Sequence, residues 1–239
     1  MKKAQTKHVF SNPNKQWTIT IIIFIVLYTF FMWYHAVRGK PYSIFTTEKC
    51  IAIAVVFCIG FALALGPLSR FSKSFQKALP YRRSLGLTAA FMSVLHVLLV
   101  IFYLPYKFPD KYSKSFLLSW FFSNWLTTLM GILILVLLLI IAFHSFPGGV
   151  KKLGRRKWMI LQKLSYLVML FLVIHLLSLG KVPGWIEWWR TFNQPFPPGA
   201  FTTTTFCVLV LLLKVVDLIV HGDSLAGEAQ EKYITADEA

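Results

Sequence analysis

The chain has 239 residues, of which 56% are hydrophobic and only 14% are charged. Soluble domains carry about 25% charged residues, so this composition excludes a disordered chain and indicates a membrane protein. Lys and Arg number 25 against 9 Asp and Glu, a net charge of +16. These charges interrupt apolar runs and form no single basic face, so no nucleic acid partner is expected.

The three cysteines, Cys50, Cys58 and Cys207, lie inside apolar runs and show no CxxC spacing. This pattern supports neither a disulfide framework nor a thiolate zinc site. The three thiols are therefore predicted to be buried and unreactive.

Six stretches nearly free of charge reach the length of about 20 mostly apolar residues that a membrane helix needs. They are residues 16–37, 50–69, 84–106, 115–150, 158–180 and 191–213, with helices expected at 120–143 in the fourth and at about 200–220 in the last. No small-residue cleavage site follows the first stretch, so it is expected to remain as a helix and not to be removed as a signal peptide. The sequence thus predicts an all-α membrane protein, a six-transmembrane-helix bundle over residues 16–220, with an N-terminal tail (1–15) and an acidic C-terminal tail (221–239).

Positive charges are unevenly divided between the two sides of this bundle. The two tails and the segments 70–83 and 151–157 together carry 15 Lys and Arg, and the opposite loops carry eight. Cytoplasmic segments hold the excess of Lys and Arg. Both termini are therefore predicted to be cytoplasmic.

Two of the six histidines are predicted to lie deep in the membrane, where an ionisable residue is a functional candidate. His96 is ten residues past Gly86, about 15 Å along the helix axis, and His175 lies in the outer half of the fifth helix. Their compatible depths on two parallel helices would let both imidazoles coordinate one haem iron. Alternatively, each histidine merely bonds a polar group of a neighbouring helix. The other four are expected in the tail or at helix ends, and they are His8, His35, His144 and His221.

The strings YRRSLGLTAAFMSVLH and LGRRKWMILQKLSYLVMLFLVIHLLSLG carry a family resemblance. They resemble the ferric reductase-like transmembrane family, and within it the small haem-binding membrane subunits of periplasmic methionine sulfoxide reductase, the branch known as MsrQ or YedZ. The resemblance covers residues 50–215. It implies that His96 ligates haem b, and its pattern in the fifth helix matches Trp158, Gln162, Tyr166 and His175.

The resemblance also implies one haem where some relatives hold two. Gln162 stands where the family often has a first histidine, and Arg83 occupies the matching place thirteen residues before His96. The inner site would therefore have Arg83 and Gln162 in place of two histidines. One haem b is predicted, at the outer site, with His96 and His175 as the iron ligands.

An electron from the cytoplasmic side would need a bridge to this outer haem, and a flavin (FMN or FAD) is the candidate. Its binding groups would come from aromatic residues and from the basic loops. They are Trp125, Trp158 and Tyr166, with Arg82, Arg83, Arg155 and Arg156. Arg190, beside Trp185, Trp188 and Trp189 in an outer loop, could meet a haem propionate or a periplasmic partner. The alternatives are the positive-inside bias for the basic loops and an interfacial aromatic belt for the outer loop.

The expected function is that of a haem b-containing membrane electron-transfer subunit in a bacterial inner membrane. Electrons would pass from a cytoplasmic reductase or quinol to an external acceptor, either a periplasmic oxidoreductase or a metal ion. The alternative is a non-redox scaffold or accessory subunit of a larger membrane complex. A transporter is a weaker alternative, because no paired broken helices are found and the deep charges, Lys163, Lys214 and Asp217, lie toward the inner side. Lys214 and Asp217 are three residues apart, so they can face each other.

Overall fold

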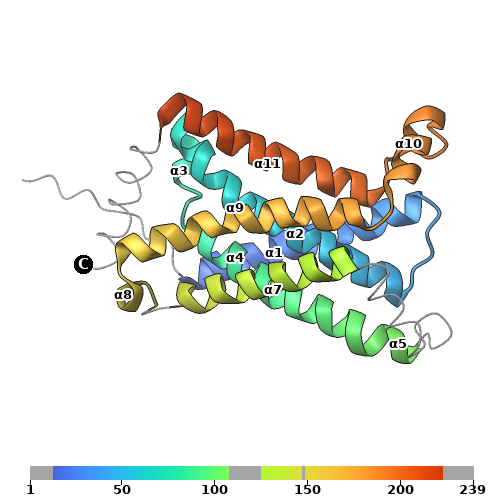
Figure 1. The fold of residues 1–239 in the computed structure, drawn as a ribbon, viewed down its shortest axis with the longest axis horizontal. Coiled ribbons are helices and arrows are strands. Elements are labelled where there is room, and N and C mark those ends of the chain that lie inside the picture. The colour runs from blue at the N-terminus through green and yellow to red at the C-terminus, as the bar shows by residue number, and fades with distance from the viewer. Residues whose placement is uncertain (1–12, 108–124, 147–148, 223–239) are drawn as a thin grey trace, which may run out of the picture.

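The computed structural model describes residues 13–107, 125–146 and 149–222. Every regular element in these ranges is helical (Figure 1). The elements are α1 (Pro13–Val37), α2 (Ile44–Phe71), α3 (Lys73–Gln76), α4 (Tyr81–Leu98), the π-helical η1 (Leu99–Tyr103), α5 (Leu104–Lys107), α7 (Trp125–Ser145), α8 (Gly149–Leu153), α9 (Arg155–Ser178), α10 (Val182–Thr191) and α11 (Gly199–His221). Six helices in the described part of the chain are long and apolar enough to cross a membrane, namely α1, α2, α4 with η1, α7, α9 and α11. The predicted all-α bundle with six spans is therefore confirmed.

Helix α2 is the central element of the bundle. In its most apolar window 61% of the residues are buried, against 17–28% in the other five spans. Helices α4 and α9 each pack against both α2 and α7, while α1 and α11 pack on the outer side of this group. The four helices α2, α4, α7 and α9 therefore form an inner bundle in which α4 and α9 lie diagonally across from each other.

Helix α1 begins and α11 ends at the same end of the bundle, beside α3 and α8, while α5 and α10 lie at the other end (Figure 1). We call these the basic end and the aromatic end. The basic end includes the Lys- and Arg-rich segments 70–83 and 151–157, and the aromatic end includes Trp185, Trp188 and Trp189 of α10. Placement of the first and last described helices at one end follows from the even number of spans.

The second helix begins six residues before the predicted residue 50. Ser43 caps it, since its hydroxyl accepts from the backbone N–H of Thr46 at 3.2 Å. The first turns therefore include Glu48, which is buried, and Lys49, whose ammonium group lies 3.7 Å from the centre of the Phe45 ring. The absence of charged residues therefore predicted the start of this helix too late, because its first turns contain two charged residues.

The same helix contains Pro67 and continues four residues past it. Proline has no N–H, so its position in a helix leaves the carbonyl four residues earlier without a partner. Here that carbonyl belongs to Leu63, and the hydroxyl of Tyr166 from α9 donates to it at 3.2 Å. The lost backbone bond is replaced by a side chain, and the helix reaches Phe71.

Other boundaries differ less. Helix α7 ends at Ser145, and residues 120–124 of its predicted start lie outside the described residues. Helix α11 extends one residue beyond the predicted 200–220 at each end. The outer loop holds the unpredicted helix α10, which buries Trp185 against the ring of Phe201, 5.7 Å between centroids. Cys50, Cys58 and Cys207 are all buried, as predicted.

Candidate functional site

His175 is held by helix α7, which packs along its own helix α9. Its Nδ1 lies 2.9 Å from the carbonyl oxygen of Thr127. A carbonyl oxygen can only accept, so Nδ1 carries the hydrogen and the lone pair of the neutral ring is on Nε2. The ring lies over Gly131, where an added Cβ would be 3.5 Å from the ring carbon Cε1. The Thr127 hydroxyl bonds the Ser178 hydroxyl at 2.7 Å and so fixes the two helices at this level.

His96 on α4 is held in a comparable way by helix α2. Its Nδ1 lies 2.8 Å from Oε1 of Glu48, a pair that meets the distance of a hydrogen bond but not its angle. The Glu48 side chain is 8% exposed and that of His96 is 28% exposed. An ionised carboxylate is also an acceptor only, so this contact again favours a hydrogen on Nδ1 and a lone pair on Nε2.

The two imidazoles belong to the diagonal helices α4 and α9 of the inner bundle, and an electrostatic interaction links them. In the described residues both rings make their polar contacts through Nδ1. A metal-ligating histidine typically donates its other N–H to a carboxylate or a backbone carbonyl, and one acceptor of each kind lies beside an Nδ1 here. Both histidines thus have an acceptor beside Nδ1, and their use as ligands through Nε2 stays a prediction.

The backbone beside His96 is irregular. Helix α4 ends at Leu98 and continues as the π-helical η1, and the N–H of Leu99 is shared between the carbonyls of His96 and Leu95. Such wide turns are uncommon and are frequent at functional sites. The change of helix type begins three residues after His96.

A site built on two histidines suits a haem iron better than a bare metal ion. In the described ranges no group of three or more His, Cys, Asp and Glu side chains could hold a metal. A porphyrin supplies four nitrogens to its iron, so two axial imidazoles complete the coordination. The donor set on α4 and α9 therefore fits a haem with two histidine ligands.

The other predicted cofactor-binding residues lie away from this pair. Arg83 is exposed in the first turn of α4, and the half-buried Gln162 on α9 makes contacts of its own. Each is thirteen residues from the histidine of its helix, about 20 Å along the axis. Arg190 is exposed on α10 at the aromatic end. Their predicted roles stay predictions.

The three aromatic residues suggested for a flavin are not brought together. Trp125 begins α7 near the end of α9, and the buried Trp158 lies in the first turn of α9 at the opposite end of this helix pair. Tyr166 uses its hydroxyl for the Leu63 carbonyl. Trp125 and Trp158 cannot line one flavin site, because some twenty residues of α9, about 30 Å, separate their levels.

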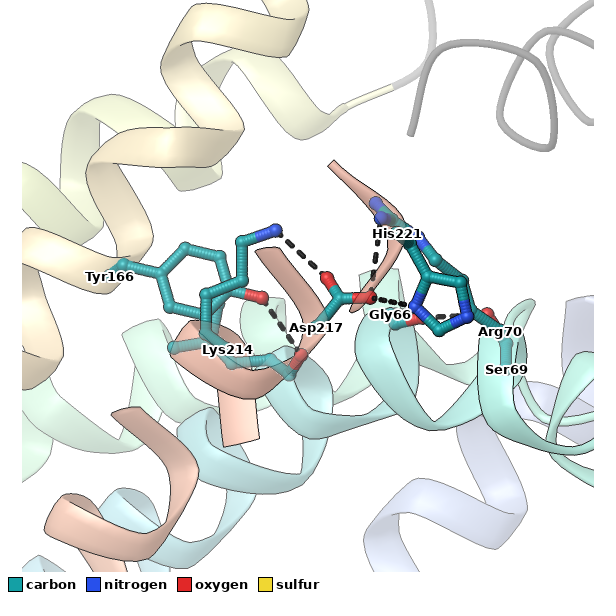
Figure 2. Close-up of polar contacts among 8 residues, drawn as sticks. Gly66, Ser69, Arg70, Tyr166, Lys214, Asp217 and His221 are labelled. Carbon is teal, nitrogen blue, oxygen red and sulfur yellow. Dashed lines mark hydrogen bonds and ion pairs between the residues drawn. The ribbon is translucent and has the colours of Figure 1, made fainter. Parts of the chain in front are cut away.

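A second polar cluster lies at the basic end, around Asp217 of α11 (Figure 2). Its fully buried carboxylate lies 3.2 Å from Nη1 of Arg70 on α2, 3.0 Å from Nζ of Lys214 and 3.4 Å from Nδ1 of His221. The pairing of Lys214 with Asp217 is confirmed, whereas Arg70 and His221 were not predicted to join it. The cluster links α11 to α2.

Another histidine, His35, lies two residues before the end of α1, at a helix end as predicted. It is buried there, and its Nε2 has no partner among the described residues. Its ring lies against the start of α11, 3.3 Å from where a Cβ on Gly199 would be. This close approach explains why α11 begins with glycine.

Six apolar spans around a histidine pair define an integral membrane protein of the all-α class. The family model described as ferric reductase like transmembrane component matches residues 49–173, just over half of the chain. The chain belongs to this family, and membership indicates electron transfer in a membrane. The match includes His96, begins directly after Glu48 and ends two residues before His175. No curated protein matches the chain.

Proposed function

We propose that the protein is a haem b-containing electron-transfer subunit with His96 and His175 as the two axial ligands of one haem. The observation that supports this most is that both rings have a hydrogen-bond acceptor beside Nδ1. Each Nδ1 lies within 3 Å of an acceptor on a neighbouring helix, the Glu48 carboxylate or the Thr127 carbonyl, and ligation would then use Nε2. Family membership adds the expectation of haem.

Two protein ligands also favour a carrier over a site that binds a substrate. With imidazole on both faces, a haem iron has no open position, so it exchanges single electrons without binding the reacting molecule. The residues of this chain would hold the rings in place and keep water away. The buried Val168, Met169 and Leu172, on the turns of α9 before His175, supply apolar surroundings.

The direction proposed for the electrons is from a cytoplasmic reductase or quinol to an external acceptor. A periplasmic oxidoreductase is the first candidate for that acceptor and a metal ion the second. The absence of a GxGxxG motif from the sequence favours a separate donor. An FMN or FAD bridge would belong at the basic end, near Arg82 and Arg83, and a bacterial inner membrane with cytoplasmic termini is the proposed location.

A non-redox scaffold remains the second candidate, because Gln162 stands where the wider family often has a histidine. A chain that had lost one haem site could have lost both. The two proposals differ in whether the purified protein carries haem.

The test is a visible spectrum of the detergent-purified protein, oxidised and then reduced with dithionite, together with a pyridine haemochrome count. We expect a sharp reduced α band and about one haem b per chain. His96→Ala and His175→Ala should each lose the haem because each removes one of two axial ligands. His144→Ala is the matched control, since that ring bonds only the Ile140 carbonyl of its own helix among described residues.

A colourless wild-type protein, after expression with ample haem, would support the scaffold. Haem retained at full occupancy in both His96→Ala and His175→Ala would contradict the assignment of ligands. In that case a different pair of residues would have to hold the iron.

A further inference from the structure

We infer that Glu48 is a positioning residue for His96, and that its buried carboxylate makes the two axial histidines unequal and lowers the reduction potential of the haem. This inference rests on the proposed function. The family match begins after Glu48, and the charge-free stretches of the sequence excluded this residue from the second helix.

The first step of the argument is the burial of the carboxylate. Glu48 lies in the second turn of α2, inside the bundle, and is 6% exposed. A buried carboxylate is costly unless it is paired or hydrogen-bonded. The polar atom beside it is Nδ1 of His96 on α4, 2.8 Å from Oε1. The ammonium group of the neighbouring Lys49 lies 3.7 Å from the centre of the Phe45 ring.

The second step compares the acceptors of the two histidines. His96 has a carboxylate beside Nδ1, whereas His175 has the neutral carbonyl oxygen of Thr127. Partners in this outer shell orient a ligating imidazole, and a carboxylate raises its basicity more than a carbonyl does. The imidazole of His96 would therefore donate more electron density through Nε2 than that of His175.

The third step is the effect on the electron equilibrium. A more basic ligand and a nearby negative charge both stabilise the oxidised iron, which carries one positive charge more than the reduced iron. The geometry of α2 and α4 thus favours a haem that gives its electron away readily. Replacing the carboxylate with an amide of the same shape removes both effects and keeps the packing.

The experiment is a potentiometric titration of the haem α band in the purified full-length wild type, Glu48→Gln and Glu187→Gln. Glu187 is an exposed carboxylate on α10 at the same end of the bundle, so it controls for the loss of one negative charge. We expect Glu48→Gln to keep its haem and to shift the equilibrium toward the reduced form at least tenfold, which is about 59 mV for one electron. The g-values of the oxidised haem, measured by electron paramagnetic resonance, should change in the same variant and stay unchanged in Glu187→Gln.

The possible outcomes separate the role of Glu48 from the proposed function. A haem-loaded Glu48→Gln with the potential and g-values of the wild type overturns the inference and leaves the proposed function intact, whereas a wild type without haem overturns both. If Glu48→Gln holds no haem, Glu48→Asp decides. Haem retained there near the wild-type potential supports the role of the carboxylate, and haem lost there too shows that Glu48 serves the fold.

Discussion

Gly131 is the residue of α7 over which the His175 ring lies. A methyl group at this position would be 3.5 Å from the ring carbon Cε1, an ordinary van der Waals distance. A larger side chain would occupy the place of the ring and push Nδ1 away from the Thr127 carbonyl. The position therefore tolerates one added carbon and no more.

We expect Gly131→Leu to lose haem and Gly131→Ala to retain it. Overpacking of a well-packed site forces side chains out of their preferred positions, at about 1–3 kcal/mol, and here the side chain that must move is His175, the proposed ligand. The measurement is the ratio of haem to protein after purification, with Gly131→Ala as the matched control. Equal haem content in both variants would show that the ring is not confined by α7.

Asp217 provides the negative charge for three basic groups at the basic end of the bundle. We expect Asp217→Asn to lower the stability by about 1–3 kcal/mol, since it leaves Arg70 and Lys214 without a counter-charge in a largely buried place. Thermal unfolding in detergent, followed by circular dichroism, measures the change.

The exposed Glu187 again supplies the control, because Glu187→Gln removes a carboxylate that is not buried. Its unfolding temperature should match that of the wild type. An unchanged unfolding temperature for Asp217→Asn would mean that the cluster of Figure 2 adds nothing to the attachment of α11.

At the scale of single residues the sequence singled out the two histidines but not the groups that contact them. His96 and His175 stand out because an ionisable residue inside an apolar run is rare and costly. Glu48 was missed because the second helix was predicted from residue 50, the first position of a stretch without charges, whereas α2 begins at Ile44. The Thr127 carbonyl has no signal in the sequence at all, since every residue has one, and only the packing of α7 on α9 selects it.

Gly60 is a contact point between helices α2 and α11. The Phe206 ring stacks on Phe57 at 4.1 Å between centroids and nearly parallel, and it occupies the space where a Cβ on Gly60 would lie. The absence of a side chain lets the two helices approach closely at this level, as small residues do between membrane helices.

We expect Gly60→Ala to destabilise the protein by about 1–3 kcal/mol, because the added methyl group overlaps the Phe206 ring. Gly86→Ala is the matched control. It also lies in a spanning helix, α4, but nothing lies within 4 Å of its added methyl group, and alanine favours a helix by up to about 1 kcal/mol. Thermal unfolding of both variants should therefore shift in opposite directions, and a Gly60→Ala as stable as the wild type would contradict the close approach.

The apolar runs of the sequence predicted that the spanning helices exist and that they are α-helices. The residues at which a helix begins and ends depend on single side-chain contacts. The Ser43 cap and the buried Glu48 extend α2 toward the aromatic end, and the Tyr166 hydroxyl lets it pass Pro67. Helix α10 could not be found from apolar length because it has only ten residues. Its tryptophans suggested an aromatic belt, and the helix arises where Trp185 packs on α11.

In the whole molecule, the histidine pair and the Asp217 cluster lie at different depths along the bundle axis. The histidine pair lies toward the aromatic end, where Thr127 near the start of α7 and Ser178 at the end of α9 meet. The Asp217 cluster lies toward the basic end, near the end of α11 and of α2. An electron carrier with a single haem at this level would be close to the aromatic end and farther from the basic one. Which end meets which compartment therefore decides which partner is near the haem.

We expect the basic end to face the cytoplasm, since 15 of the Lys and Arg residues lie in the tails and segments assigned to that side and eight in the opposite loops. Lys77→Cys after α3 and Glu187→Cys in α10 place one thiol at each exposed end, while the native cysteines are buried. A membrane-impermeant maleimide applied to right-side-out spheroplasts should label Glu187→Cys at once and Lys77→Cys only after the membrane is opened. The reverse pattern would place the histidine pair on the cytoplasmic side, and the acceptor would then have to be sought in the cytoplasm.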